Sequence, residues 1–411
     1  MKNTIFLLFI GIMIASCNQK TNSTKESTEL TEKNTLTADS LTNELNEIYK
    51  RGYINGFSVA IVNPNEKLYQ NGFGYANIED KKEYTENTIQ NIASISKISI
   101  AVALLKAKEM GLLELDDAIN KHLPFEVLNP YFPNEEITIR QLATHTSSIV
   151  DSDFYWEKVY VLKDKLSDEQ AKNKEFVDFF NTPDSYLPLS EFLEKMLHKD
   201  SEWFKKETFA NRKPGEFNEY SNIGAALCAL VIESAAKTPF NEFTKKHIFT
   251  PLEMNSTGWF FDEVDLDKFS KLYIDKTELP HYIGLTYPDG HLITSSSDLA
   301  KLLEELIKGY SGNGTLLNKD SYSELFKSQL EKKHFEEGDN DNVGIFIEKL
   351  ITRNVIGHSG SDLGVFTLMF FDPEKKIGRI LIKNTESESD EANQAFWDVW
   401  NTLEKYQDRL E

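Results

Sequence analysis

Residues 92–105 read IASISKISIAVALL, and the interpretation of the whole chain starts from this stretch. Its apolar residues have helical spacing, and we expect the helix to end at Gly111. Ser94 and Lys97 stand three residues apart at its start, which puts both side chains on one face, with the ammonium within reach of the hydroxyl. Serine is a weak nucleophile without such a neighbour, so the pair indicates covalent catalysis. Unpaired N–H groups of a first helical turn, including that of Ser94, are available to a developing oxyanion.

The S-x-x-K spacing is a weak signal by itself, because it occurs a second time at Ser234 and Lys237. That copy falls where an apolar helical segment is ending, and helix ends present unpaired carbonyls rather than N–H donors. We therefore exclude Ser234 as a nucleophile.

A second element must carry the proton between hydroxyl, lysine and leaving group. The pattern Y-x-N begins four times, and the copies at Tyr53, Tyr69 and Tyr75 fall in or beside an expected N-terminal β-hairpin. Tyr220 differs, because a helical pattern follows Asn222 directly. Residues i and i+2 of an extended segment point the same way, so this phenol and carboxamide can enter one cleft.

The segment GHSGS at 357–361 looks like the nucleophile elbow of an α/β-hydrolase, with Ser359 on the turn. The elbow has Gly two residues after its Ser, where this chain has Ser361. An elbow Ser also precedes its acid and its His, whereas His358 is the last histidine of the chain. Ser359 is therefore excluded as the nucleophile, and a different role is needed for this histidine and its neighbours.

Three motifs taken together resemble those of the serine β-lactamase-related family, which contains class C β-lactamases, D-Ala-D-Ala carboxypeptidases and related esterases. They occur in the family's order: Ser94-x-x-Lys97, Tyr220-x-Asn222 and His358-Ser359-Gly360. The flanking segments ITIRQLATHTSSI, KPGEFNEYSNIGAAL and HLITSSSDLAKLL are also similar to the family's. The resemblance covers about residues 45–405.

The resemblance implies an acyl-enzyme on Ser94, with Lys97 and Tyr220 as a coupled proton-transfer pair. It implies that substrate is bound by Asn222, His358, Ser359 and Gly360, and that the oxyanion hole is formed by the backbone N–H groups of Ser94 and Ser361. It implies neither a cofactor nor a metal ion. The expected substrate is a small peptide-like amide or ester, with cell-wall-related compounds included.

The expected fold is α/β (α+β) of the β-lactamase/transpeptidase type, an antiparallel sheet flanked by helices with an inserted, mostly helical subdomain. We assign residues 41–112 and 281–411 to the sheet part and residues 113–280 to the helical subdomain. Hairpin patterns near both ends of the globular part support this division.

Several positions depart from the family's pattern. Ser148 replaces a Gly, which concerns backbone freedom more than chemistry, and His145 is interpreted as a structural histidine without metal-ligand spacing around it. The span between Ser147 and Pro214 is long and rich in aromatic residues. It forms either extra packed structure or a lid that shapes the substrate.

His358 stands where β-lactamases carry Lys. An unperturbed histidine is mostly neutral at pH 7, so a substrate carboxylate would be attracted less strongly. Some carboxypeptidases of the family also have His here, so peptide substrates stay open. The acidic segment NTESESDEANQ (384–394) either supplies N-terminal charge to a helix or borders the cleft.

The N-terminus has the anatomy of a secretory signal, with an apolar run from Ile5 to Ala15. IASC (14–17) resembles a bacterial lipobox, which predicts lipidation of Cys17 after removal of the leader; an ordinary signal peptide is the alternative. Residues 18–40 lack aromatic residues and are expected to form a disordered tether. Cys228, the other cysteine, is expected to be a buried free thiol.

The charge of the chain narrows the possible partners. Its 45 basic and 66 acidic residues give a formal net charge of -21, which disfavours nucleic acid and anionic lipid surfaces. We therefore expect contact with a membrane through the lipid anchor alone, in a bacterial cell envelope. A catalytically inactive binding lipoprotein and a short-chain esterase or weak β-lactamase remain alternatives, and the oligomeric state is not indicated.

Overall fold

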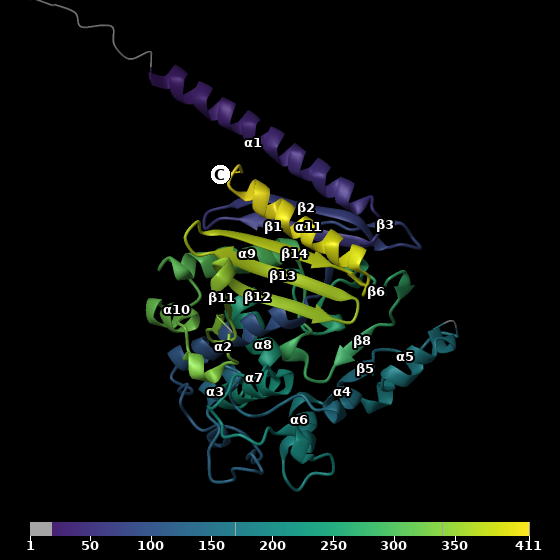
Figure 1. Cartoon of the computed structure of the whole chain (residues 1–411), viewed down its shortest axis with the longest axis vertical. Helices are drawn as coiled ribbons and strands as arrows, with labels where there is room; N and C mark the ends of the chain where they lie inside the picture. The colour runs from purple at the N-terminus through teal and green to yellow at the C-terminus, as the bar shows by residue number, and fades with distance from the viewer. Residues whose placement is uncertain (1–18, 169, 339, 411) are drawn as a thin grey trace, which may run out of the picture.

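The computed structural model describes residues 19–410 apart from positions 169 and 339, and an eight-stranded sheet lies at its centre (Figure 1). The strands follow the order β10-β11-β12-β13-β14-β1-β2-β3, and all neighbouring pairs are antiparallel. Their bounds are β1 Gly56–Val62, β2 Lys67–Asn77, β3 Lys82–Glu83, β10 Asn342–Val343, β11 Glu348–Leu350, β12 Val355–Asp362, β13 Val365–Asp372 and β14 Ile377–Lys383. The predicted antiparallel sheet built from both ends of the globular part is confirmed.

Both faces of the sheet are covered, which explains why β1 is buried along its whole length. Alternate residues point to opposite faces: Phe57, Val59 and Ile61 pack under α1 (Gln19–Tyr49) and α11 (Asp390–Gln407). Ala60 and Val62 join the larger core on the other side.

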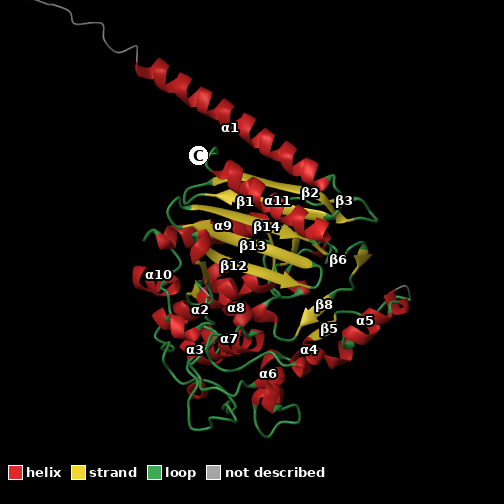
Figure 2. Cartoon of the chain, in the orientation of Figure 1, coloured by secondary structure: helices red, strands yellow, loops and turns green. Residues whose placement is uncertain are grey.

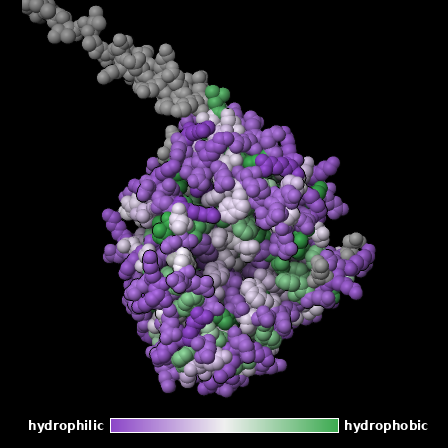
Figure 3. Space-filling view, viewed as in Figure 1, coloured by the Kyte–Doolittle hydropathy of each residue, from purple (hydrophilic) through white to green (hydrophobic). Residues whose placement is uncertain are grey.

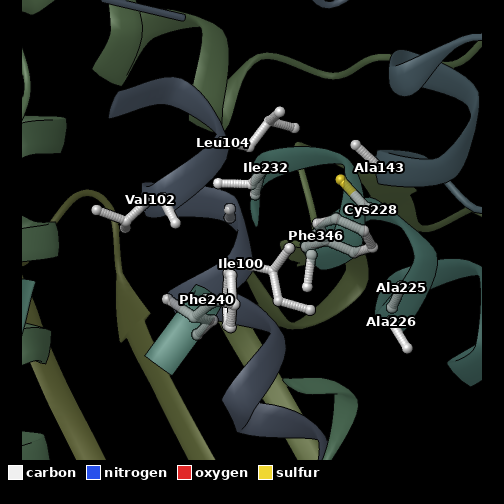
Figure 4. Close-up of a cluster of buried hydrophobic side chains, with 14 of the residues drawn as sticks. Ile100, Val102, Leu104, Ala143, Ala225, Ala226, Cys228, Ile232, Phe240 and Phe346 are labelled. Atoms are coloured by element: carbon white, nitrogen blue, oxygen red, sulfur yellow. The ribbon is translucent and has the colours of Figure 1, made fainter. Parts of the chain in front are cut away.

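The second face carries the helical part of the molecule (Figure 2). Its helices are α2 Lys97–Glu109, α3 Ile139–Ala143, α4 Asp153–Val159, α5 Lys174–Phe179, α6 Leu189–Leu197, α7 Asn222–Ala236, α8 Phe240–Thr244, α9 Ser296–Tyr310 and α10 Lys319–Phe326. Figure 4 shows how Ile100 and Leu104 of α2 meet Ile232 of α7 and Phe240 of α8 in one cluster. The central pair α2 and α7 therefore forms a rigid, apolar platform.

Short strand pairs connect this platform to the sheet. They are β4 (Ile89–Asn91) with β9 (Ile293–Ser295), β5 (Tyr160–Leu162) with β8 (Tyr282–Gly284), and β15 (Thr385–Glu386) with β6 (Tyr273–Ile274) and β7 (Thr277–Glu278). Strand β4 directly precedes the turn that carries Ser94.

The N-terminal segment differs from the expectation of a disordered tether over residues 18–40. The structure places residues 19–49 in one helix, α1. Leu41, Leu45 and Ile48 are buried against α11 at helical spacing, and Glu44 pairs with Lys405 at 2.7 Å. Once this end is docked, each further residue adds a hydrogen bond without a new nucleation step, so the helix extends through polar sequence.

Candidate active site

Ser94 and Lys97 meet where a short 3-10 helix, η1 (Ala93–Ser96), runs into α2. The α-helix therefore begins at Lys97, three residues later than expected. Residues i and i+3 of a 3-10 turn lie directly in line, and Lys97 Nζ is 3.1 Å from Ser94 Oγ. The buried ammonium also donates to Asn222 Oδ1 and to the carbonyl of Asp289, each at 2.7 Å. All three of its protons are used, as a buried cation requires.

The residue before Ser94 adopts an unusual backbone conformation. Ala93 has a φ of +50°, in the left-handed region that L-residues rarely occupy. The carbonyl of Ile92 accepts a hydrogen bond from the Thr367 hydroxyl of β13 at 2.8 Å. The backbone N–H of Ile92 donates to the carbonyl of Leu292 at 3.0 Å. The surrounding strands thus hold the nucleophile's turn in a fixed position.

Tyr220 and Asn222 stand on either side of the start of α7. Ser221 between them is extended and caps the helix, its hydroxyl accepting the N–H of Gly224 at 3.0 Å. The expected extended segment is therefore present, and it directs Asn222 onto Lys97.

The Tyr220 ring lies over Lys97, with Nζ 4.8 Å from the ring centroid. Although 44% of the residue is exposed, its hydroxyl end is desolvated. Desolvation raises the pKa of Tyr220, while the charge of Lys97 and the polar groups of Lys97 and Ser94 beside the phenol oppose that rise. The phenol, the amine and the nucleophile therefore lie close together, and their role as a proton-transfer pair stays a prediction.

Asp151 supports this arrangement and was not identified from the sequence. Its carboxylate accepts the N–H groups of Asn222 at 2.9 Å and Ile223 at 3.0 Å. It caps α7 beside Ser221, and the positive end of the helix favours an anion there. Burial raises the pKa of Asp151, and these backbone hydrogen bonds work against the rise. The position follows the HTSSIV segment directly, but nothing in its local pattern indicates the contact.

His145 packs beneath Tyr220, with the two ring centroids 4.5 Å apart. Its Nδ1 accepts the N–H of Ser221 at 3.2 Å. Burial lowers the pKa of His145 well below its usual value, and the charges of Lys97 and His358 lower it further. The histidine is neutral and structural, in agreement with the sequence interpretation.

His358 lies buried on β12, facing Tyr220 at 6.3 Å between ring centroids. Its Nδ1 is 3.2 Å from Glu348 Oε1 and 2.5 Å from the carbonyl of Ser359, so two acceptors hold a proton on this nitrogen. Burial lowers the pKa of His358, opposed by the charge of Glu348. Glu348 also accepts the Ser359 hydroxyl at 3.0 Å, so the structure turns this hydroxyl to Glu348.

Gly360 is the point where β12 touches the nucleophile's turn. A Cβ added there would lie 2.9 Å from the backbone nitrogen of Ser94 and 2.5 Å from Thr367 Oγ1. Only glycine fits this approach. The backbone of β12 at Ser361 follows immediately, so the predicted oxyanion-hole nitrogens belong to two segments in van der Waals contact. Their role in holding an oxyanion stays a prediction.

Part of the long aromatic span lies beside the end of β12. The rings of Trp156 and Phe179 stack on Tyr160 with centroids 6.2 and 5.5 Å away. The Tyr160 hydroxyl donates to Asp362 Oδ1 at 2.8 Å, at the end of β12. Figure 3 shows a mostly hydrophilic face on which apolar residues gather toward β8 and α5; Phe179 of α5 is 45% exposed.

The rest of that span is packed structure. Trp203 meets Phe154 and Phe192 with centroids 6.3 and 6.2 Å apart, and three lysines lie over these aromatic rings. This portion agrees with the interpretation as extra packed structure, and the lid stays a prediction.

The acidic segment 384–394 serves mainly as the start of a helix. Ser389 caps α11, and Asp390 and Glu391 stand in its first turn. Glu386 accepts the N–H of Gly364 at 3.0 Å, in the turn that follows β12. The segment touches the end of the site through Glu386.

The remaining sequence interpretations fall outside the cluster. Lys237 is the left-handed C-cap of α7, so the second S-x-x-K copy lies at a helix C-terminus. Cys228 is a buried free thiol, and Ser148 has a φ of +63°, as expected where the family has Gly. Cys17 lies outside the described residues.

The described residues also bear on metal binding and on membrane insertion. Within them, no group of three or more His, Cys, Asp or Glu side chains is arranged to hold a metal ion. No single helix of this part is long and apolar enough to cross a membrane; only the bent pair Asn222–Ala236 and Phe240–Phe249 reaches that length and composition. The first helix of this pair is buried in the core.

Known proteins share this fold. A family profile described as Beta-lactamase matches residues 39–404. Protein flp of Staphylococcus aureus (strain MW2) is 25% identical over 350 residues, 82% of this chain and 61% of that protein. Penicillin-binding protein 4* of Bacillus subtilis (strain 168) is 25% identical over 344 residues, 79% of this chain and 67% of that protein. The octameric penicillin-binding protein homologue from Pyrococcus abyssi has a TM-score of 0.68 at 26% identity, covering 89% of this chain and 77% of that one.

These similarities agree with the antiparallel sheet and its helical covering. The chain spans about 61% of the length of its Staphylococcus relative, so the similarity concerns the shared domain. The profile covers nearly all of the described part of the chain, and it confirms the β-lactamase/transpeptidase-like fold expected from the three motifs. The chain belongs to the Beta-lactamase family.

Proposed function

We propose that this hydrolase cleaves neutral peptide-like amides or esters through an acyl-enzyme on Ser94, while held at a bacterial membrane by lipid on Cys17. The observation that carries the proposal is the placement of Lys97 Nζ, which joins Ser94 Oγ to Asn222 Oδ1 in a buried network. A protein that only bound its ligand would need none of this proton-transfer machinery.

The reaction uses the coupled pair Lys97 and Tyr220 as its proton store. In the structure Lys97 donates three hydrogen bonds. The pair of Lys97 and Tyr220 must therefore lose one proton before it can accept the proton of the Ser94 hydroxyl. Ser94 Oγ then attacks the carbonyl carbon, and the N–H groups of Ser94 and Ser361 receive the oxyanion. Collapse of the intermediate breaks the amide or ester bond, and Tyr220 returns the proton to the leaving group. Water, deprotonated by the same pair, releases the acyl group and restores Ser94.

The charge around the cleft favours neutral substrates. His358 replaces the permanent cation of β-lactamases, and burial lowers its pKa, so it adds little positive charge at neutral pH. Glu348 lies 3.2 Å from that ring and Glu386 lies by the turn after β12. The exposed rings of Trp156 and Phe179 offer an apolar surface beside them. We infer weak β-lactam hydrolysis and better turnover of peptide-like amides, cell-wall-related ones included, or of neutral esters.

The proposal of an envelope lipoprotein rests on the IASC motif and on relatives that are named penicillin-binding proteins. A bacterial lipoprotein's several acyl chains hold it firmly, whereas one chain binds only marginally. Full-length protein should partition with membranes and Cys17→Ser protein should not. Membrane retention of the Cys17→Ser protein would contradict the anchor.

A fluorophosphonate probe tests the chemistry. Wild-type protein should be labelled on Ser94, and Ser94→Ala protein of unchanged circular dichroism should not. Absence of any adduct on folded wild-type protein would favour the inactive binding protein. A panel of D-peptides, β-lactams and short-chain esters then ranks the substrates, with the short-chain esterase and the weak β-lactamase as defined outcomes.

A further inference from the structure

Two tyrosines outside the catalytic cluster contact both segments that carry the predicted oxyanion hole. Tyr160 lies on β5 and Tyr282 on β8, and these two short strands pair antiparallel. The two rings meet edge-on with centroids 5.5 Å apart. Neither hydroxyl has a role in the reaction proposed above, so their contacts need another explanation.

The Tyr282 hydroxyl joins the two segments directly. It accepts a hydrogen bond from Asn91 Nδ2 at 3.2 Å and donates to the carbonyl of Leu363 at 3.0 Å. Asn91 stands three residues before Ser94, and Leu363 stands two residues after Ser361. Tyr282 and Asn91 are only 5% and 6% exposed, and hydrogen bonds are stronger in such places because the local dielectric is low. One hydroxyl therefore holds the two segments at a fixed spacing.

Tyr160 adds a second contact at Asp362, the residue next to Ser361. Its hydroxyl donates to Asp362 Oδ1 at 2.8 Å, and the backbone N–H of Leu363 donates to the same oxygen at 2.8 Å. Two donors thus hold a carboxyl group whose side chain is 6% exposed. The position of the end of β12 is therefore set from β5 as well as by the neighbouring strand of the sheet.

Apolar packing supports the same two segments. One buried cluster contains Ala93 and Val365 together with Leu162, Phe180 and Tyr282. Ala93 immediately precedes the nucleophile and has the positive φ described above, and Val365 begins β13 beside the end of β12. A residue in this backbone region keeps its conformation only where its surroundings over-determine it. The long aromatic span therefore helps to hold the nucleophile's turn.

We propose that Tyr282 and Tyr160 are positioning residues for the predicted oxyanion hole. They set the distance between the backbone nitrogens of Ser94 and Ser361. The inference rests on the proposed function, in which these two N–H groups receive the oxyanion. Such a hole stabilises the developing charge only when its donors already stand at hydrogen-bond distance from it. The two segments approach closely at Gly360, so a small shift of β12 would misplace one donor. Both tyrosines act through these segments and not through contact with the substrate.

Tyr282→Phe removes the bridging hydroxyl and keeps the ring. Deleting one oxyanion donor lowers kcat by about 10²–10³-fold, and misplacing one has a smaller effect. We therefore expect kcat for p-nitrophenyl acetate to fall by about tenfold, with little change in KM. The inhibition constant of phenylboronic acid should rise by a similar factor, because its adduct with Ser94 places an oxygen in the oxyanion hole.

Tyr322→Phe is the matched control, because it also removes a buried tyrosine hydroxyl, one that donates to Glu305 between α9 and α10. It should lose stability in urea much as Tyr282→Phe does, but keep the kcat and the boronate inhibition constant of wild type. Wild-type kinetics in Tyr282→Phe, or equal kinetic losses in Tyr282→Phe and the control, would overturn the proposal.

Tyr160→Phe tests the second contact and decides the proposal if Tyr282→Phe does not fold. Its ring can still stack on Trp156 and Phe179, so the fold should persist. A smaller displacement of β12 should then lower kcat by at least about threefold and weaken the boronate to the same extent. Unchanged values of both constants in folded Tyr160→Phe would contradict its positioning role.

A double variant tests the bridge itself. Asn91→Leu removes the donor to the Tyr282 hydroxyl. Combined with Tyr282→Phe, it should lower kcat no further than Tyr282→Phe alone, because residues of one hydrogen-bonded unit have non-additive effects. Full additivity of the two losses would show that Asn91 and Tyr282 act separately and not as a bridge.

Labelling of Ser94 by a fluorophosphonate separates this proposal from the proposed function. If wild-type Ser94 is not labelled, the proposed catalysis fails and the oxyanion hole fails with it. If wild-type Ser94 is labelled and the tyrosine variants react equally fast, the catalysis stands and only the positioning roles fail.

Discussion

The carboxylate of Asp151 accepts the backbone N–H of Asn222 at 2.9 Å, and the side chain of the same asparagine accepts from Lys97 at 2.7 Å. A half-buried acid thus fixes the first residue of α7, and that residue in turn fixes the amine beside Ser94. The position of the proton-transfer pair depends on a helix cap.

Replacing this cap tests that dependence. Asp151→Asn keeps one acceptor oxygen but loses the charge, and charge-assisted hydrogen bonds are worth about 1.5–3 kcal/mol. We expect the free energy of unfolding in urea to fall by that amount and kcat to fall with it, while KM changes little. Asp153→Asn, an exposed acid in the first turn of α4, is the matched control. Unchanged kcat in Asp151→Asn would remove its positioning role.

Ser359 should be dispensable for acylation. Its hydroxyl donates to Glu348, whereas the hydroxyl of Ser94 meets the amine of Lys97. Ser359→Ala should keep labelling by a fluorophosphonate, and Ser94→Ala should lose it completely. If the two variants are equally inactive, the nucleophile has been assigned wrongly.

Tyr220→Phe should lower kcat by at least about 10²-fold, the usual contribution of a proton-transfer group. The ring can still pack on His145 and lie over Lys97, so the melting temperature should stay close to wild type. Hydrolysis of p-nitrophenyl acetate measures the effect. A loss smaller than tenfold would show that Lys97 works without the phenol.

His358→Lys should raise the reactivity toward a chromogenic cephalosporin relative to p-nitrophenyl acetate. The new ammonium would face Glu348, which offsets part of its charge, so the double variant with Glu348→Gln should show the larger shift. Efficient cephalosporin turnover by the wild-type enzyme at pH 7, undiminished at pH 8, would contradict the role given to His358.

Stability should fall in mild acid through His291. Burial lowers the pKa of His291 to about 4, so between pH 6.5 and 4 the unfolded chain binds its proton and the folded one does not. Stability therefore decreases as the pH falls through this window, by up to about 3 kcal/mol. Urea unfolding at pH 7.5 and 4.5 should show a smaller decrease in His291→Gln than in wild type.

Asp362 supplies a control of opposite sign. Burial raises the pKa of Asp362 to about 6. As the pH falls from 6 to 4 the folded chain therefore binds a proton here before the unfolded chain does, and the folded state gains stability. Asp362→Asn should therefore steepen the acid loss. If the free energy of unfolding changes with pH in the same way in wild type, His291→Gln and Asp362→Asn, neither His291 nor Asp362 has the pKa shift assigned to it.

The motifs predicted those contacts of the site that join residues close together in the sequence, and the structure adds the contacts between residues far apart in the sequence. The spacing of Ser94 and Lys97 and the extended conformation of Ser221 follow from short-range geometry, and both were anticipated. Asp151 and Glu348 were not, because their contacts join segments 71 and 11 residues apart without a pattern of their own. The expected tether failed for a related reason, since composition says nothing of a docked neighbour such as α11.

If Cys17 carries the lipid as proposed, helix α1 bears on how far the enzyme stands from the membrane. Its 31 residues make a rod of about 46 Å at 1.5 Å per residue, whereas a flexible coil of that length would fluctuate around roughly 30 Å. The rod projects from the body in Figure 1 and docks on the sheet face opposite to α2. With Cys17 as the anchor, the active site would lie at a set height and orientation above the lipid. The distance between membrane and active site, together with the shape of the active site, would then decide which surface-attached substrates are cleaved.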